Sequence, residues 1–199
     1  DTIRVSLTED SPNEIAVCND IIEQIRELTD ADAGVSSVVL SYDPFDYQRR
    51  STPEIKLADG VKCGGEQTVC VVVVQSAWDK LAACIKPGDD VKPEAIYEEL
   101  NVMEIDPREE FTVNCDTQLV TVKDGVELPI ITAFRLLSGR LKTVGASNPI
   151  LLKDCLAFGE TALEPNIVLL RASVVIGSLL CDGIGDAILV RGESGAGRS

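Results

Sequence analysis

The stretch NIVLLRASVVIGSLLCDGIGDAILV, residues 166–190, carries the pattern on which the fold assignment rests. Residues 166–180 are predominantly apolar and follow Pro165, which suits the first turn of a helix. Gly183 and Gly185 come directly after, where glycine commonly ends a helix, and the apolar run at 187–190 predicts a buried strand. A helix that leads straight into a buried strand indicates an α/β fold.

The same alternation of strands and helices recurs along the chain. In DTIRVSL, residues 1–7, apolar and polar residues alternate, which predicts a strand. Ser11 and Glu14 then form a capping box for a helix at residues 13–28. Further strands are expected at residues 35–41, 68–74, 111–115, 119–122 and 149–153, further helices at 77–85, 93–100 and 129–141, and a long loop at 43–65. Buried strands rich in Val, Ile and Leu favour a parallel or mostly parallel sheet.

Composition limits the classes of partner. The 199 residues suffice for one large domain or two small ones, and the net charge of −15 repels phosphate backbones and anionic membrane surfaces. The longest apolar run, VCVVVV at residues 69–74, is far shorter than the roughly 20 residues that span a bilayer. We therefore expect neither a nucleic-acid partner nor a membrane partner, and no targeting leader.

Cysteine and histidine usage limits the chemistry. The chain has no histidine, which removes Ser-His-Asp and Cys-His catalysis and histidine-ligated zinc. Its seven cysteines are scattered without a C-x-x-C pair, so we expect them to be reduced, mostly buried and not to bind metal: Cys18, Cys63, Cys70, Cys84, Cys115, Cys155 and Cys181.

Three short segments, in this order, resemble one known family. They are DTIRVSLTED at residues 1–10, FDYQRR at 45–50 and LLCDGIGDAILV at 179–190. Together they resemble the long, three-domain form of the 4-hydroxy-3-methylbut-2-enyl diphosphate synthase family, in which an extra domain is inserted between a substrate-binding barrel and a cluster domain.

The resemblance implies a domain organisation. Residues 1–28 would be the last strand and helix of the parent barrel, residues 29–191 the inserted α/β domain, and residues 192–199 a divergent or artificial tail. The inserted domain would be TIM-barrel-like or built on a mostly parallel sheet. Its role would be that of a spacer that holds the cluster domain of the same chain.

The family also implies a reaction. Its members reduce 2-C-methyl-D-erythritol 2,4-cyclodiphosphate in non-mevalonate isoprenoid biosynthesis, with a [4Fe-4S] cluster and electrons from ferredoxin or flavodoxin. Arg4 and Ser6 match the R-x-S of the last barrel strand, where two residues on one face can reach one phosphate of the cyclic diphosphate. The family holds its cluster in a further domain with a C-x-x-C pair, so we expect this chain alone to bind no cluster and to have no turnover. The resemblance places the parent enzyme in the bacterial cytoplasm, or in a plastid if the source is eukaryotic.

Two segments have alternative interpretations. GESGAGRS, from Gly192 to Ser199, follows a strand with the spacing of a phosphate-binding loop, so a nucleotide-binding fragment is the alternative function. Against it, Arg198 stands where that motif has lysine, and no helix follows to complete the anion site. In FDYQRR, we expect Arg49 and Arg50 to make surface ion pairs, with a contact between domains as the alternative.

Overall fold

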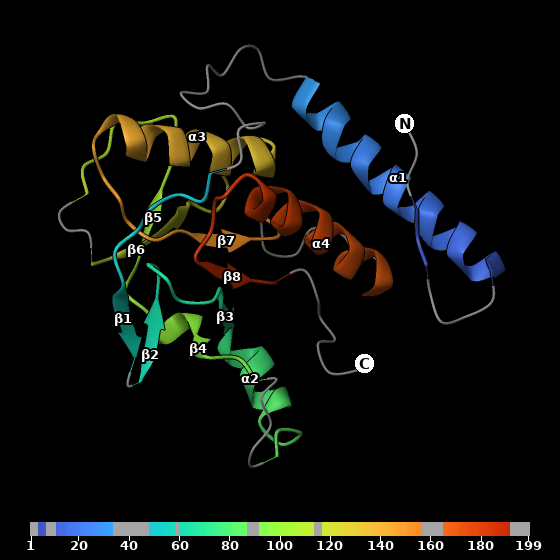
Figure 1. Cartoon of the computed structure of the whole chain (residues 1–199), viewed down its shortest axis with the longest axis horizontal. Coiled ribbons are helices and arrows are strands. Elements are labelled where there is room, and N and C mark those ends of the chain that lie inside the picture. Colours follow the sequence, from blue (N-terminus) through green and yellow to red (C-terminus); the bar gives the residue numbers. More distant parts are fainter. Residues whose placement is uncertain are drawn as a thin grey trace.

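The computed structural model describes residues 4–6, 11–33, 48–58, 60–86, 92–113, 117–156 and 165–191 (Figure 1). Helices and strands alternate along most of this length. In chain order they are α1 (Ser11–Ala33), β1 (Ile55–Ala58), β2 (Val61–Cys63), β3 (Cys70–Val73), α2 (Gln75–Leu81), β4 (Ala95–Ile96), the 3-10 turn η1 (Tyr97–Glu99), β5 (Val102–Ile105), β6 (Leu119–Val122), α3 (Ile130–Thr143), β7 (Leu151–Lys153), α4 (Pro165–Cys181) and β8 (Ala187–Leu189).

The main sheet is parallel throughout. Its four-stranded part has the order β4-β3-β8-β7, and β5 pairs with β6 in a second parallel ladder. A parallel bridge between Val120 and Ile150 joins β6 to β7, so that all six strands follow one another in space. The sheet has β4 and β5 at its two edges, and η1 links these edges in sequence. The mostly parallel form of the predicted fold is therefore confirmed.

The sheet curls around an apolar inner face to which every one of its strands contributes. The side chains that share this face are small or of medium size: Cys70, Val72, Ala95, Val102, Leu119, Leu151, Ala187 and Leu189. Since edge strands β4 and β5 both contribute, the two edges converge on one core. We call this structure the curled sheet.

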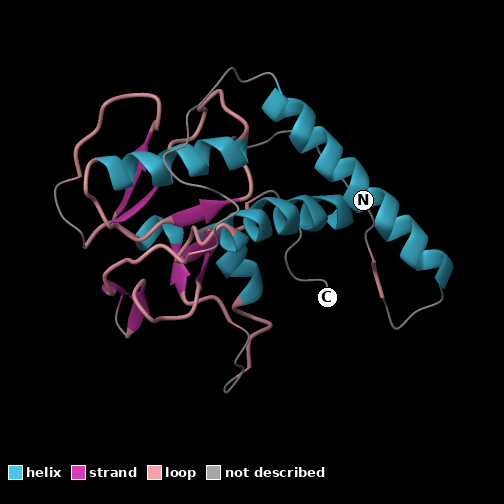
Figure 2. Cartoon of the chain, turned by 45° about the horizontal axis from the view of Figure 1, so that its top comes forward, coloured by secondary structure: helices cyan, strands magenta, loops and turns pink. Residues whose placement is uncertain are grey.

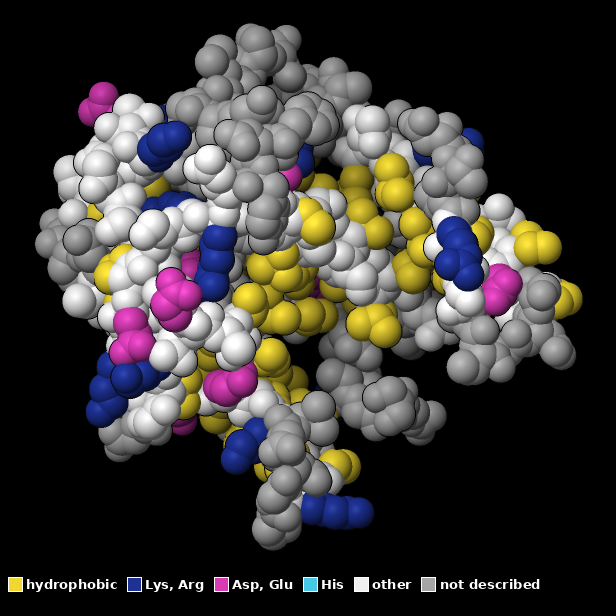
Figure 3. Space-filling view, in the orientation of Figure 1, with side chains coloured by type: hydrophobic (Ala, Val, Ile, Leu, Met, Phe, Trp, Pro, Cys, Tyr) yellow, Lys and Arg dark blue, Asp and Glu magenta, His cyan; other side chains and the backbone are white. Residues whose placement is uncertain are grey.

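The outer face of the curled sheet packs against helices (Figure 2). Val120, Val122 and Leu152 point outward into a second core, because successive residues of a strand face opposite sides. The helical side of that core consists of apolar residues at three- and four-residue spacing, namely Phe134, Leu137 and Leu141 of α3 and Val175, Ile176 and Leu179 of α4. Helix α1 lies against α4, with an ion pair of 3.7 Å between Glu27 and Arg171, and apolar side chains are visible at the surface over α4 (Figure 3).

Asp186 organises the amino edge of the curled sheet. Its two carboxylate oxygens accept hydrogen bonds from Thr52 Oγ1 at 2.8 Å and from the Ile150 N–H at 3.0 Å. Its carbonyl oxygen accepts from the Cys70 N–H at 3.0 Å and from Cys63 Sγ at 3.3 Å. One residue thus ties the start of three strands to the β1-β2 hairpin, which is antiparallel.

Several predicted elements match the structure closely. The strand predicted at 119–122 is β6, the helix predicted at 129–141 is α3, and the strand predicted at 187–190 is β8. The helices predicted at 13–28 and 166–180 are α1 and α4; α1 continues past the proposed domain boundary at residue 28. No helix in the described part of the chain is long and apolar enough to span a membrane.

Other predicted elements are wrong. Residues 93–100 form β4 and a 3-10 turn in place of a helix, because Ala95 and Ile96 pair with β3. Residues 111–113 are not a strand, and part of the expected loop at 43–65 is the β1-β2 hairpin. The strand expected at 35–41 lies outside the described residues.

Gly183 allows a test of the close backbone contact between residues 48–50 and the turn that precedes β8. It has a φ of +75°, and an added Cβ would meet the Gln48 carbonyl oxygen closer than side chains tolerate. Gly145 has a similar φ of +72° but open space around it. We expect Gly145→Ala to cost roughly 1–2 kcal/mol of unfolding free energy from backbone strain alone, and Gly183→Ala to cost clearly more. Urea unfolding of both variants measures this, and equal losses would contradict the close approach.

Candidate functional site

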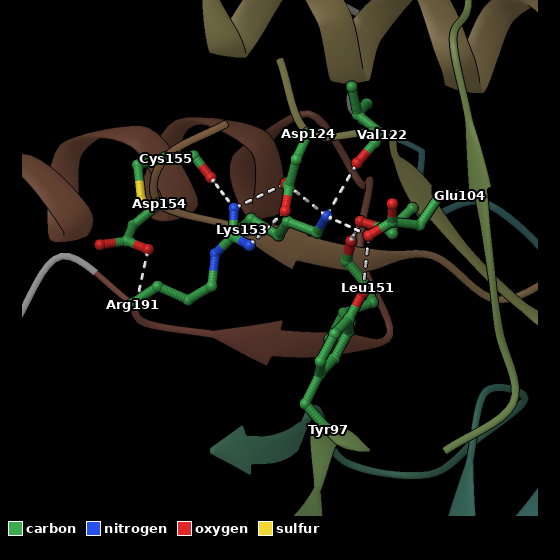
Figure 4. A network of polar contacts seen from close by, with 10 residues as sticks. Tyr97, Glu104, Val122, Asp124, Leu151, Lys153, Asp154, Cys155 and Arg191 are labelled. Atoms are coloured by element: carbon green, nitrogen blue, oxygen red, sulfur yellow. Dashed lines mark hydrogen bonds and ion pairs between the residues drawn. The ribbon is translucent and has the colours of Figure 1, made fainter. Parts of the chain in front are cut away.

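Lys153 is the centre of a polar network at the carboxyl edge of the curled sheet (Figure 4). It is the last residue of β7 and its side chain is 0% exposed. The Nζ atom donates to Asp124 Oδ1 at 2.8 Å, to the Val122 carbonyl oxygen at 2.9 Å and to Glu104 Oε1 at 3.1 Å. An ammonium group has three donors, so this set of acceptors engages all of them.

Arg191, just after β8, completes the network with a second cation. Its side chain is 1% exposed and makes a bidentate pair with the carboxylate of Asp124, with both nitrogen–oxygen distances at 2.7 Å. Nη2 also donates to the Cys155 carbonyl oxygen at 2.6 Å, and the backbone N–H of Arg191 donates to Asp154 Oδ1 at 2.7 Å. Arg191 therefore contacts the segments that follow β6 and β7.

Tyr97 covers the network from the side of β4. Its hydroxyl donates to Glu104 Oε1 at 2.8 Å, and its ring centre lies 5.9 Å from Lys153 Nζ, within range of a cation–π contact. Burial, and then the bond to Glu104, raise the pKa of the Tyr97 hydroxyl. Tyr97 is therefore a neutral donor. We call Tyr97, Glu104, Asp124, Lys153, Asp154 and Arg191 the Lys153 network.

Asp124 is the shared anion of the network. Burial of its carboxylate opposes ionisation, but hydrogen bonds from Arg191 and Lys153 outweigh this effect and lower its pKa. Burial also disfavours the charged Arg191, yet the pair with Asp124 raises the pKa of the guanidinium. Both groups are thus held in their charged forms, as a desolvated ion pair requires.

The topology explains why these residues meet. Carboxyl ends of parallel strands lie at one edge of a sheet, and alternation puts Lys153 on the inner face with Leu151 and Glu104 on the inner face with Val102. In parallel barrels this edge is where active sites lie. In this protein, the ammonium group of Lys153 and the guanidinium group of Arg191 lie at that edge and are neutralised by carboxylates of the same chain. Lys153 is therefore a structural cation rather than a nucleophile.

Arg4 and Ser6, the predicted phosphate-binding residues, lie outside this network. Both are exposed, with Val5 half-buried between them. The predicted strand is wrong over residues 4–6, which are in neither a helix nor a strand, while residues 1–3 and 7 lie outside the described part. A single extended segment becomes a strand only when a neighbouring strand supplies its hydrogen bonds.

The six cysteines in the described part of the chain are free thiols of three kinds, of which Cys18 and Cys155 are half-buried. Cys63 and Cys70 are buried, but Cys84 and Cys181 are exposed, so the expectation of mostly buried cysteines is wrong. Burial raises the pKa of Cys63 to about 12 and that of Cys70 to about 11, which keeps both as neutral thiols. Among the described residues no group of cysteines and acids could hold a metal ion, so these residues do not fit a [4Fe-4S] cluster. Cys115 lies outside the described residues.

The two arginines of FDYQRR behave differently. Arg49 makes the expected ion pair, at 3.9 Å from Asp186, and also donates to the Gln67 carbonyl oxygen. Arg50 is half-buried and donates to the carbonyl oxygens of Ala146 and Asn148, and it makes no ion pair with any described residue, so the expected surface ion pair is wrong for this residue. Burial lowers the pKa of Arg50.

Sequence reasoning did not find the Lys153 network, although a signal was present. Asp124, Lys153 and Arg191 stand at or just after three apolar runs that predict strands. In a parallel sheet, charged residues at such positions gather at one edge. Glu104 gave no comparable signal, since its strand was not predicted.

The fold and the network define an α/β protein with a parallel curled sheet whose carboxyl edge is closed by ion pairs. Over 201 aligned residues the chain is 38% identical to the 4-hydroxy-3-methylbut-2-en-1-yl diphosphate synthase (flavodoxin) of Akkermansia muciniphila. The alignment covers 98% of this chain and 33% of that protein, so the chain spans about one third of the relative it matches.

This similarity confirms the family resemblance inferred from the three short segments. It does not support the nucleotide-binding alternative for residues 192–199, which lie outside the described part of the structure. No family model matches the chain, and no solved structure matches it.

Removing the central cation tests whether the Lys153 network holds the sheet edge together. Lys153→Met removes the ammonium partner of Glu104 and one of the two buried cations that hold Asp124, and we expect a loss of up to about 3–5 kcal/mol in unfolding free energy. Lys62→Met removes a lysine from an exposed pair with Glu54 at 2.7 Å and serves as the control, with a far smaller loss expected. Chemical denaturation measures both, and similar losses would argue against a central role for Lys153.

The depressed pKa of Asp124 predicts acid sensitivity. Because the folded-state pKa is lowered, this carboxylate stabilises the fold fully above its unfolded pKa of about 3.9 and loses that effect as pH falls through the folded value. We expect Asp124→Asn to be less stable than the parent at about pH 6 and to lose less stability on going to about pH 3. Glu23→Gln, at an exposed position of α1, is the control. The assignment would be contradicted if all three proteins lost the same amount of stability between about pH 6 and about pH 3.

Proposed function

We propose that this chain is a segment of a 4-hydroxy-3-methylbut-2-enyl diphosphate synthase of the long, three-domain form. The observation that carries this proposal is the 38% identity over 98% of the chain to a synthase of which it spans 33%. Residues 1–28 would contribute the last strand and helix of the substrate-binding barrel, and residues 29–191 the inserted domain, itself TIM-barrel-like.

The inserted domain acts in this proposal as a spacer rather than as a second active site. The Lys153 network supports this role, because cations at the carboxyl edge of the sheet are already neutralised by Glu104 and Asp124. Such an arrangement holds its shape without a ligand. A spacer needs that property, since it has to place its neighbouring domains in every state of the enzyme.

The whole enzyme would reduce a cyclic diphosphate, with a flavodoxin or ferredoxin as the electron donor; the relative's name specifies flavodoxin. A [4Fe-4S] cluster would be held by a separate domain, since the described cysteines of this chain do not fit one. The expected compartment is the bacterial cytoplasm, or the plastid of a eukaryote.

Arg4 and Ser6 would bind one phosphate of the substrate. Both side chains are exposed and two positions apart, which leaves a guanidinium and a hydroxyl available to one anion. Their strand would form within the complete barrel, where a neighbouring strand supplies the missing hydrogen bonds.

The test uses the full-length synthase that contains this chain. Hydrogen bonds to charged groups contribute about 1.5–3 kcal/mol, so Arg4→Gln should raise the KM for the cyclic diphosphate roughly 10- to 100-fold. Arg26→Gln, which changes an exposed arginine of α1, should leave KM unchanged. Failure of the parent enzyme to convert the substrate would overturn the proposed function. An active enzyme whose KM is insensitive to Arg4→Gln would overturn the role of Arg4.

A further inference from the structure

The described chain leaves the curled sheet through Arg191, which is held by both its backbone and its side chain. The backbone N–H bonds Asp154 at 2.7 Å, and the guanidinium bonds both oxygens of Asp124 and the Cys155 carbonyl oxygen. The side chain of Arg191 alone would be enough to neutralise the carboxylate of Asp124. The additional backbone bond also fixes the path of the main chain at this point.

The anchor on which Arg191 rests is itself rigidly held. Asp124 also accepts a hydrogen bond from the buried Lys153, and the neighbouring Gly125 N–H donates to the Leu156 carbonyl oxygen at 2.7 Å. The segments after β6, β7 and β8 are therefore locked to one another. In Figure 4 Arg191 reaches back across the end of β7 toward Asp124.

We propose that Arg191 is a positioning residue that, through Asp124 and Asp154, sets the direction in which the chain leaves the inserted domain. In the complete synthase this direction determines where the following domain lies relative to the substrate-binding barrel. This inference rests on the proposed function and assigns the spacer role to one set of contacts.

In this proposal, substrate binding and the placement of the following domain depend on different residues, and the two therefore affect different kinetic constants. Arg4 and Ser6, the proposed phosphate ligands, are not among the contacts of Arg191, so we expect substrate affinity to be independent of those contacts. A displacement of about 1 Å between reacting groups can cost roughly 100-fold in rate. Loss of the Arg191 contacts should therefore lower kcat and leave KM unchanged.

The experiment compares Arg191→Gln with Arg135→Gln in the full-length enzyme. Arg135 makes a half-buried ion pair with Asp182 at 2.8 Å, which is matched in type but remote from the chain exit. We expect Arg191→Gln to lower kcat roughly 10- to 100-fold at unchanged KM and unchanged iron content per chain. Arg191→Lys should recover part of the loss, because lysine keeps the charge but not the bidentate geometry. Hydrogen exchange should rise in the segment that follows Arg191 in that variant and not in Arg135→Gln.

Two outcomes would overturn the inference while leaving the proposed function intact. One is an active parent enzyme in which Arg191→Gln and Arg135→Gln have the same kcat and the same exchange pattern. The other uses Asp154→Ala, which removes the acceptor for the Arg191 backbone N–H while keeping the Arg191 side chain, and which serves if Arg191→Gln does not fold. An unchanged kcat and unchanged exchange in Asp154→Ala would show that the backbone contact does not set the chain direction. An inactive parent enzyme would instead contradict the proposed function itself.

Discussion

The buried ammonium group of Lys153 is the constraint on which the carboxyl edge of the molecule depends. A charge with no access to water is strongly destabilising unless acceptors surround it. Two separate segments supply those acceptors: Glu104 lies on β5, and Val122 and Asp124 lie at and just after the end of β6. Displacement of either segment would leave a buried charge partly unsatisfied. The lysine thus makes the relative positions of β5, β6 and β7 interdependent.

The two edges of the curled sheet use the same principle with opposite charges. At the amino edge Asp186 accepts hydrogen bonds from N–H and O–H donors of three segments, and at the carboxyl edge Lys153 donates to three acceptors from two other segments. The apolar side chains between these two residues supply most of the burial but little directional information. Asp186 and Lys153 determine which segments meet at each edge of the sheet. Buried ion pairs are better suited to this role in specificity than to adding net stability.

The elements that could be predicted from sequence are those whose signal is local. Helix α3 has apolar residues at regular spacing, and β8 is a compact apolar run behind a glycine pair. The sequence pattern does not indicate β5, because Glu104 interrupts its apolar residues; that glutamate accepts a hydrogen bond from Lys153, 49 positions further along the chain. The pattern around β4 favours a helix, because the two residues of this strand are extended only through pairing with β3. The Lys153 network depends on the same long-range pairings, and its members could be suspected from sequence only as charged residues after strands.

A self-contained polar edge suits a domain that has to keep one shape with and without substrate. An open active site has unsatisfied groups that a ligand completes, and its geometry can therefore differ between the free and bound states. The Lys153 network supplies its own counter-charges, so a small anion would have to displace Asp124 from two cations in order to bind. In the proposed synthase, binding energy released elsewhere in the enzyme would then not be dissipated in rearranging this sheet. A rigid spacer would convert closure of the proposed neighbouring domains into a defined approach, and Arg191, held by that same carboxylate, would carry the rigidity of the sheet to the chain beyond it.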